Sequence, residues 1–99
     1  MAEIAALHSL EIPYTFNVPA AIVGDEVTAA DKAMGAIASA YWVEFAKTGD
    51  PNGSGRPLWP RHDPASGRVI NFTNMGAVVE ADPLQARLDL WQKVWTQGR

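Results

Sequence analysis

The chain contains no cysteine and very little histidine. Without thiols, disulfide bonds and zinc sites built on thiolates are excluded. The two histidines, His8 and His62, lie far apart in the sequence, and neither has a second histidine at helical spacing. A metal site needs several ligands close together, so we expect no metal, and no motif points to a cofactor. Cysteine-free proteins occur in every compartment, so the localisation stays unknown.

The chain also has no excess of positive charge and no long hydrophobic run. Eight Lys and Arg residues stand against eleven Asp and Glu residues, which gives a net charge of −3. Because both signs are scattered, no basic patch can neutralise a row of phosphates, and we expect no nucleic-acid partner. No apolar stretch approaches the roughly 20 residues that span a bilayer. Residues 1–6 lack the basic start and apolar core of a signal peptide.

Apolar residues, by contrast, are present in the proportion typical of a folded domain. Hydrophobic residues make up 47% of the chain and charged residues 19%, a balance that argues against a disordered tail. A length of 99 residues suits one small domain at most. Residues 1–99 are therefore expected to form one domain at most.

The clearest periodic pattern predicts an amphipathic helix over residues 25–48. Thr28 followed three residues later by Asp31 has the form of a capping box, and Gly49 stands where a helix C-cap is expected. Apolar side chains recur in this segment at intervals of three or four residues, namely Val27, Ala30, Met34, Ile37, Tyr41 and Phe45.

A short hairpin and a second helix are expected in the second half of the chain. Residues 68–72 and 77–80 are rich in β-branched side chains and are separated by the turn sequence TNMG. Asp82 then offers an N-cap ahead of Pro83 at the first helical position. The apolar residues of this second helix are Leu84, Leu88, Trp91 and Trp95.

Residues 1–21 are expected to form a loop with short turns, because Pro13 and Pro19 interrupt any regular pattern. The fold class predicted for the chain by itself is therefore α+β, with two main helices, a short hairpin and loops.

The four tryptophans and the two apolar stripes require more covering surface than one hairpin offers. Trp42, Trp91 and Trp95 lie on or beside the stripes and are expected in a core, whereas Trp59 is expected to cover the long helix from a loop. This surplus suggests that the chain is part of a larger body. The alternative is a small α+β core in which the two helices pack on each other and on the hairpin.

Few side chains are candidates for chemistry. His8 is either a catalyst or an ordinary loop histidine, and Glu11 either orients it across one helical turn or binds backbone amides. Asp50, Asp63 and Asp82 stand beside prolines or at a helix start, where carboxylates usually accept backbone amides. No serine lies in a Gly-x-Ser-x-Gly context, so the chain shows no nucleophile elbow.

Three segments taken together resemble the C-terminal end of the type-B carboxylesterase/lipase family, α/β-hydrolases that include bacterial para-nitrobenzyl esterases and cholinesterases. The segments are ALHSLEIPYTF, SAYWVEFAKTGDPNGSGRPLWPRHD and RVINF, and the resemblance extends over residues 5–95. It implies that the chain is the C-terminal part of an α/β-hydrolase fold. It also implies that His8 is the catalytic histidine of a Ser-Glu/Asp-His triad, whereas Glu11 matches a structural glutamate.

The resemblance further implies that the chain supplies one triad member of three. In the family the serine and the acid precede the histidine, so both would lie before Met1. The isolated chain is therefore expected to be inactive, and to meet an ester substrate only within the full-length enzyme, with no cofactor. The alternative function is that of a non-catalytic, stand-alone or truncated module that acts through protein association, including self-association through exposed apolar helix faces.

Overall fold

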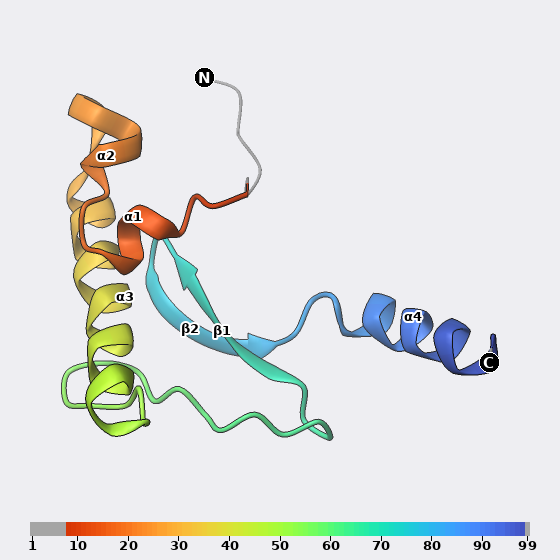
Figure 1. Cartoon of the computed structure of the whole chain (residues 1–99). Helices are drawn as coiled ribbons and strands as arrows, with labels where there is room; N and C mark the ends of the chain where they lie inside the picture. The colour runs from red at the N-terminus through yellow and green to blue at the C-terminus, as the bar shows by residue number, and fades with distance from the viewer. Residues whose placement is uncertain (1–7, 99) are drawn as a thin grey trace.

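The structure is a computed structural model that describes residues 8–98. The first part of the expected loop, residues 1–7, lies outside the described residues. A long helix, α3 (Ala29–Thr48), is the element on which the short helix of residues 12–15 and the hairpin pack (Figure 1). Its predicted ends are confirmed: Thr28 and Asp31 form a capping box, and Gly49 closes the helix in the left-handed conformation with φ 78°. The helix begins later than the predicted residue 25, because residues 24–26 form a separate 3-10 turn, η1 (Gly24–Glu26).

The segment expected to be a loop contains two short helices, α1 (Ile12–Thr15) and α2 (Ala20–Val23). The prediction was wrong here because it treated both prolines as interruptions. Pro13 lies in the first turn of α1, where the missing N–H has no helical partner to lose, and Pro19 is the N-cap of α2. Each proline starts a helix in this structure.

The predicted hairpin is confirmed and is slightly longer than expected. Strand β1 (Arg68–Thr73) pairs antiparallel with β2 (Gly76–Ala81), with Arg68 opposite Ala81 and Thr73 opposite Gly76. Within the described part of the chain the sheet has these two strands alone, so the outer edge of each strand is unpaired. The combination of helices with a two-stranded sheet agrees with the mixed fold expected from the sequence.

An aromatic cluster of Tyr41, Trp42, Trp59 and Phe72 holds α3, the following loop and the hairpin together. The ring of Tyr41 lies 5.4 Å from that of Trp59 and 5.9 Å from that of Phe72, centroid to centroid. Tyr41 is fully buried, and its hydroxyl donates to the carbonyl of Pro57. The prediction that Trp59 covers the long helix from a loop is thus confirmed. The wider core is small and adds Met34, Ala38 and Ala77.

The last helix, α4 (Gln85–Gln97), leads away from the rest of the chain, and none of its residues is buried (Figure 1). The alternative in which the two main helices pack on each other is therefore wrong for this structure. Trp91 and Trp95, expected in a core, are 72% and 67% exposed, and Trp42 is 44% exposed. The predicted N-cap is also wrong: Asp82 instead accepts the amide of Leu84 in a turn ahead of the helix.

No helix within residues 8–98 combines the length and the apolar character that crossing a membrane requires.

Candidate functional site

His8 is exposed and lies in a turn, residues 8–11, that leads directly into α1. Ser9 adopts a positive φ of 67°, and its carbonyl accepts the amide of Ile12 at 3.3 Å. The carbonyl of Glu11 accepts the amides of Tyr14 and Thr15 at 3.0 and 2.9 Å. Within residues 8–98 the His8 ring has no hydrogen-bond partner, so the position of the imidazole follows from the backbone of this turn.

Glu11 fills neither of the two roles that its spacing from His8 suggested. Its side chain is exposed, and no hydrogen bond joins its carboxylate to His8 or to a backbone amide among the described residues. Its contribution to the turn comes from its carbonyl, which begins the hydrogen bonding of α1.

Tyr14 connects α1 to the start of α3. Its hydroxyl donates to Oδ1 of Asp31 at 3.0 Å, while Oδ2 of Asp31 accepts the backbone amide and the hydroxyl of Thr28, each at 2.9 Å. The Thr28 amide and then its hydroxyl lower the pKa of Asp31, as does the Tyr14 hydroxyl to a lesser extent, and burial opposes this effect in part. Burial, followed by the hydrogen bond and charge of Asp31, raises the pKa of Tyr14. Asp31 therefore serves the helix cap and the α1 contact at once.

Gly35 allows a second close contact between α3 and the segment that follows α1. It is buried in the middle of α3, where glycine is unfavourable for helix stability. A Cβ atom at this position would lie 3.0 Å from Oδ1 of Asn17 and 3.2 Å from Cδ of the buried Pro19. The missing side chain lets residues 17–19 approach the helix backbone.

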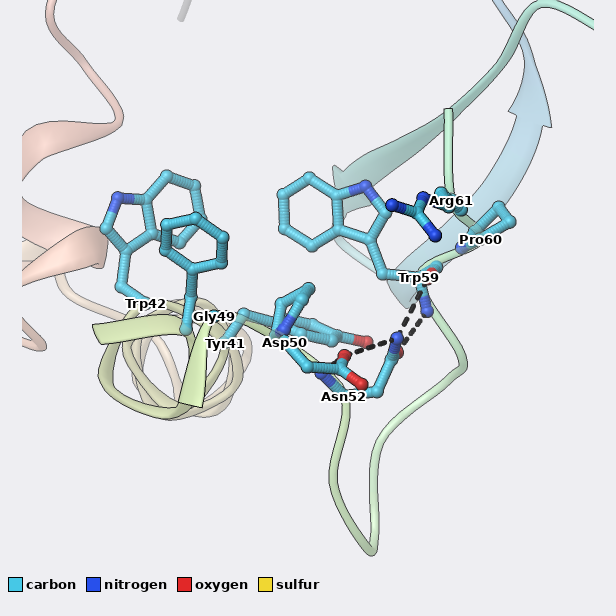
Figure 2. A pocket seen from close by; sticks show the side chains of 10 residues that line it. Tyr41, Trp42, Gly49, Asp50, Asn52, Trp59, Pro60 and Arg61 are labelled. Atoms are coloured by element: carbon cyan, nitrogen blue, oxygen red, sulfur yellow. Dashed lines mark hydrogen bonds between the residues drawn. The ribbon is translucent and has the colours of Figure 1, made fainter. Parts of the chain in front are cut away.

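Two cavities border α3. One, of about 500 Å³, lies beside the His8 turn and is lined by Leu10 and Glu11 from the turn, by Met34 from α3 and by Phe72 from the hairpin, among others. The other, of about 670 Å³, lies between the end of α3 and the following loop (Figure 2). Four of the residues that line it are aromatic, namely Tyr41, Trp42, Phe45 and Trp59, and both cavities are predominantly apolar. Polar side chains also line them, among them Asp50 and Asn52 in the larger cavity and Tyr14 and Asp31 in the smaller one.

The structural roles predicted for three aspartates are confirmed. One carboxylate oxygen of Asp50 accepts the amide of Asn52 at 2.9 Å, and that of Asp63 accepts the amide of Ala65 at 2.9 Å. Asp82 binds a backbone amide in the same way, as described above. His62, the other histidine, is exposed on the loop before the hairpin. Among residues 8–98, no three His, Asp or Glu side chains gather where they would hold a metal ion.

Comparison with known proteins identifies the class to which this turn, helix and hairpin belong. The model of the carboxylesterase family matches residues 2–91, so the chain belongs to the carboxylesterase family. It is 42% identical over 66 residues to carboxylesterase 5A of Felis catus, and 34% identical over 70 residues to carboxylesterase 3 of Pongo abelii. It is also 32% identical over 60 residues to the medium-chain fatty acyl-CoA hydrolase precursor of Anas platyrhynchos.

These matches cover most of this chain and a small part of each relative. They take in 62%, 65% and 61% of the chain and 12%, 12% and 10% of the cat, orangutan and duck proteins. The chain thus spans about an eighth of the length of the curated relatives that it matches.

The sequence alone did not reveal the contact between Tyr14 and Asp31. The two residues are 17 positions apart and belong to different helices, so no periodicity relates them. Gly35 carried a usable signal, because a glycine in the interior of a helical pattern often marks a close approach of another segment.

Proposed function

We propose that this chain is the C-terminal portion of a serine carboxylic-ester hydrolase with an α/β-hydrolase fold, and that His8 is its catalytic base. The observation that carries the proposal is the family match over residues 2–91, which includes the HSLEIPYTF segment that begins at His8. The chain contains no Gly-x-Ser-x-Gly sequence, so the proposal assigns the serine and the triad acid to a preceding part of a longer protein.

The proposed chemistry is acyl transfer. The neutral imidazole of His8 takes the proton of the serine hydroxyl as its oxygen attacks the ester carbonyl, and a tetrahedral oxyanion forms. The imidazolium then gives the proton to the departing alcohol, which leaves an acyl-enzyme. Water, activated by the same imidazole, hydrolyses this intermediate. A histidine suits the role because its ordinary pKa lies near neutral pH.

The surroundings of His8 support this proposal. A catalytic base must be held by a defined backbone and must also be accessible to its partners. His8 is exposed, has no hydrogen-bond partner within residues 8–98, and lies on a turn that continues into a helix anchored on α3. Apolar side chains such as Phe45 and Trp91, 58% and 72% exposed, offer faces that a larger domain would cover.

The test is a chimera in which this chain replaces the matching C-terminal segment of the cat carboxylesterase 5A, assayed on a para-nitrophenyl ester. We expect the chimera to be active, and His8→Ala to lower kcat by a factor on the order of 10⁴ or more. The matched control is His62→Ala, which removes the other exposed histidine and should leave kcat within about twofold of the parent chimera. The isolated chain should hydrolyse the ester no faster than free imidazole.

Two results would contradict the proposal. One is a folded His8→Ala chimera that keeps the activity of the parent. The other comes from the gene: sequencing upstream of the Met1 codon should reveal an open frame that encodes Gly-x-Ser-x-Gly followed by an acidic residue before His8. A stop codon close upstream in the same frame would leave His8 without a nucleophile.

The exposure of α4 favours one alternative, in which the chain is a non-catalytic module that associates with other proteins or with itself. Leu88, Trp91 and Val94 are 51%, 72% and 55% exposed on a helix without a buried residue. Sedimentation of the isolated chain distinguishes the two functions. A defined oligomer that dissociates when Trp91 is replaced by Glu would support the association module, and its absence would leave the hydrolase proposal.

A further inference from the structure

We infer that Tyr14 and Asp31 form a positioning pair for His8, in which the hydrogen bond between them holds α1 on α3 and thereby sets the turn that carries the imidazole. This inference rests on the proposed function of His8. Neither residue is assigned contact with substrate. Both are assigned an effect on catalysis through the backbone that leads from α1 to His8.

Within the described residues, the His8 side chain makes no polar contact that would fix its position. Its ring has no hydrogen-bond partner within residues 8–98, and its side chain is exposed. Its place follows from the backbone of residues 8–11, in which the amide of Ile12 donates to the carbonyl of Ser9 and the amide of Tyr14 donates to the carbonyl of Glu11. The turn and α1 therefore move together.

Helix α1 is too short to hold the turn in place by itself. It has four residues, one helical turn, and a helix of this length is far below what is stable in water. Its position must come from the element on which it packs, and that element is the 20-residue helix α3. Among the described residues, the Tyr14–Asp31 bond is the one side-chain hydrogen bond that joins the two helices.

The side chain of Asp31 is itself held in one orientation by Thr28. Its Oδ2 accepts both the amide and the hydroxyl of Thr28, which leaves Oδ1 directed to the Tyr14 hydroxyl at 3.0 Å. An acceptor fixed by a capping box provides a defined point at the start of α3. The second contact with α3, between Gly35 and Pro19, lies beyond α1 and farther along the chain from His8. Of these two contacts, the hydrogen bond of Tyr14 is the nearer to the turn along the chain.

The experiment compares Tyr14→Phe with Tyr41→Phe. The first variant removes a hydroxyl that binds α3, and the second removes a hydroxyl of α3 itself. Tyr41 donates to Pro57 of the loop that follows α3 and does not line the cavity beside the His8 turn, so it controls for a general loss of stability. In the active chimera, Tyr14→Phe should lower kcat roughly tenfold to a hundredfold with KM within twofold, because a shift of about 1 Å in a catalytic group has effects of this size. Tyr41→Phe should leave kcat within twofold. Asp31→Ala combined with Tyr14→Phe should cost no more than the larger single change, since the pair acts as one unit.

Amide hydrogen exchange in the full chain measures how firmly the Tyr14–Asp31 hydrogen bond holds α1. Tyr14→Phe should raise the exchange rates of residues 14–17 about fivefold to tenfold and leave the hairpin unchanged, and Tyr41→Phe should do the reverse. Unchanged exchange in residues 14–17, or an equal loss of kcat in both variants, would overturn the inference. If His8→Ala abolishes activity while Tyr14→Phe preserves it, positioning fails and the proposed function stands. If His8→Ala preserves activity, the proposed function fails, and the inference with it.

Discussion

Replacing Tyr41 is the most informative single change to the fold, because this side chain joins three separate segments. It lies on α3, contacts Trp59 of the loop and Phe72 of β1, and is fully buried. The guanidinium carbon of Arg56 lies 5.1 Å from the centre of its ring. Tyr41→Ala removes all of these contacts at once, whereas Tyr41→Phe removes the hydroxyl alone.

The expected magnitudes follow from these contacts. Truncating a buried aromatic side chain to alanine costs about 3–5 kcal/mol, and loss of the hydrogen bond to Pro57 adds about 1 kcal/mol. The sum of about 4–6 kcal/mol is comparable with the entire stability of many small domains. Tyr41→Phe should cost about 1 kcal/mol, because the ring and its neighbours remain in place.

Amide hydrogen exchange of residues 68–81 measures the effect, since the hairpin is held to α3 through the aromatic cluster. Tyr41→Ala should speed exchange there by about a thousandfold, or to the rate of an unstructured peptide if that is reached first. Tyr41→Phe should speed it about fivefold. The control is Leu58→Ala on the same loop: Leu58 is 70% exposed, and its truncation should change the rates by about twofold at most.

The reasoning is refuted if Tyr41→Ala leaves hairpin exchange as slow as Leu58→Ala does. That result would mean that the hairpin is held in place without the cluster, and that burial of Tyr41 contributes little to the position of β1.

Two further predictions concern the residues that hold the His8 turn on α3. The pKa of Asp31 is lowered in the folded chain, chiefly by the Thr28 amide, so its contribution to stability is complete above its unfolded pKa of about 3.9 and is lost as pH falls through the lower folded value. Burial raises the pKa of Tyr14, so its contribution is complete below about pH 10 and is lost as pH rises through the folded value. Circular dichroism at 222 nm should show loss of helix at both low and high pH. Asp31→Asn should reduce the dependence of the signal on pH in the acidic range, and an unchanged dependence there would contradict the role assigned to Asp31. Gly35→Ala should stabilise the chain less than the roughly 1 kcal/mol expected for an ordinary helix position, or destabilise it by up to about 2 kcal/mol, because the new methyl group meets the Pro19 ring at 3.2 Å. Urea unfolding measures this change with Ala36→Gly as the exposed control, and a full 1 kcal/mol gain would contradict the proposed close packing.

The parts of the fold that the sequence predicts correctly are those determined by neighbouring residues. Thr28 and Asp31 cap α3 through groups three positions apart, and Gly49 ends it through its own φ. The hairpin follows from two β-branched runs around a short turn. In each case the signal and its physical cause lie within a few residues of each other.

The wrong predictions depend on more distant context. Pro13 and Pro19 are equally compatible with a loop and with a helix start, and packing against α3 determines which of the two forms. The apolar stripe of α4 was expected to be buried, but within the described chain no surface covers Trp91, which is 72% exposed. A sequence pattern indicates that a helix face needs a partner and does not identify that partner.

The candidate site was predicted in the same uneven way. His8 stands out through its resemblance to a family motif, whereas local spacing alone did not decide between a catalyst and an ordinary loop histidine. The spacing of Glu11 suggested a partner for His8, which the structure does not provide. The residue that does anchor the turn, Tyr14, acts through Asp31 across 17 positions, a contact that arises only when α1 folds back onto α3.

The residues that hold the His8 turn on α3 lie close together in the sequence, which affects the order of folding. The contacts described between residues 14–19 and α3, from Tyr14 with Asp31 to Pro19 with Gly35, join residues within the first 35 of the sequence. Short sequence separations close rapidly and at low entropic cost. During synthesis these contacts with α3 can therefore form before the loop and the hairpin leave the ribosome. Any mispacking of the aromatic cluster would then occur after the His8 turn is in place.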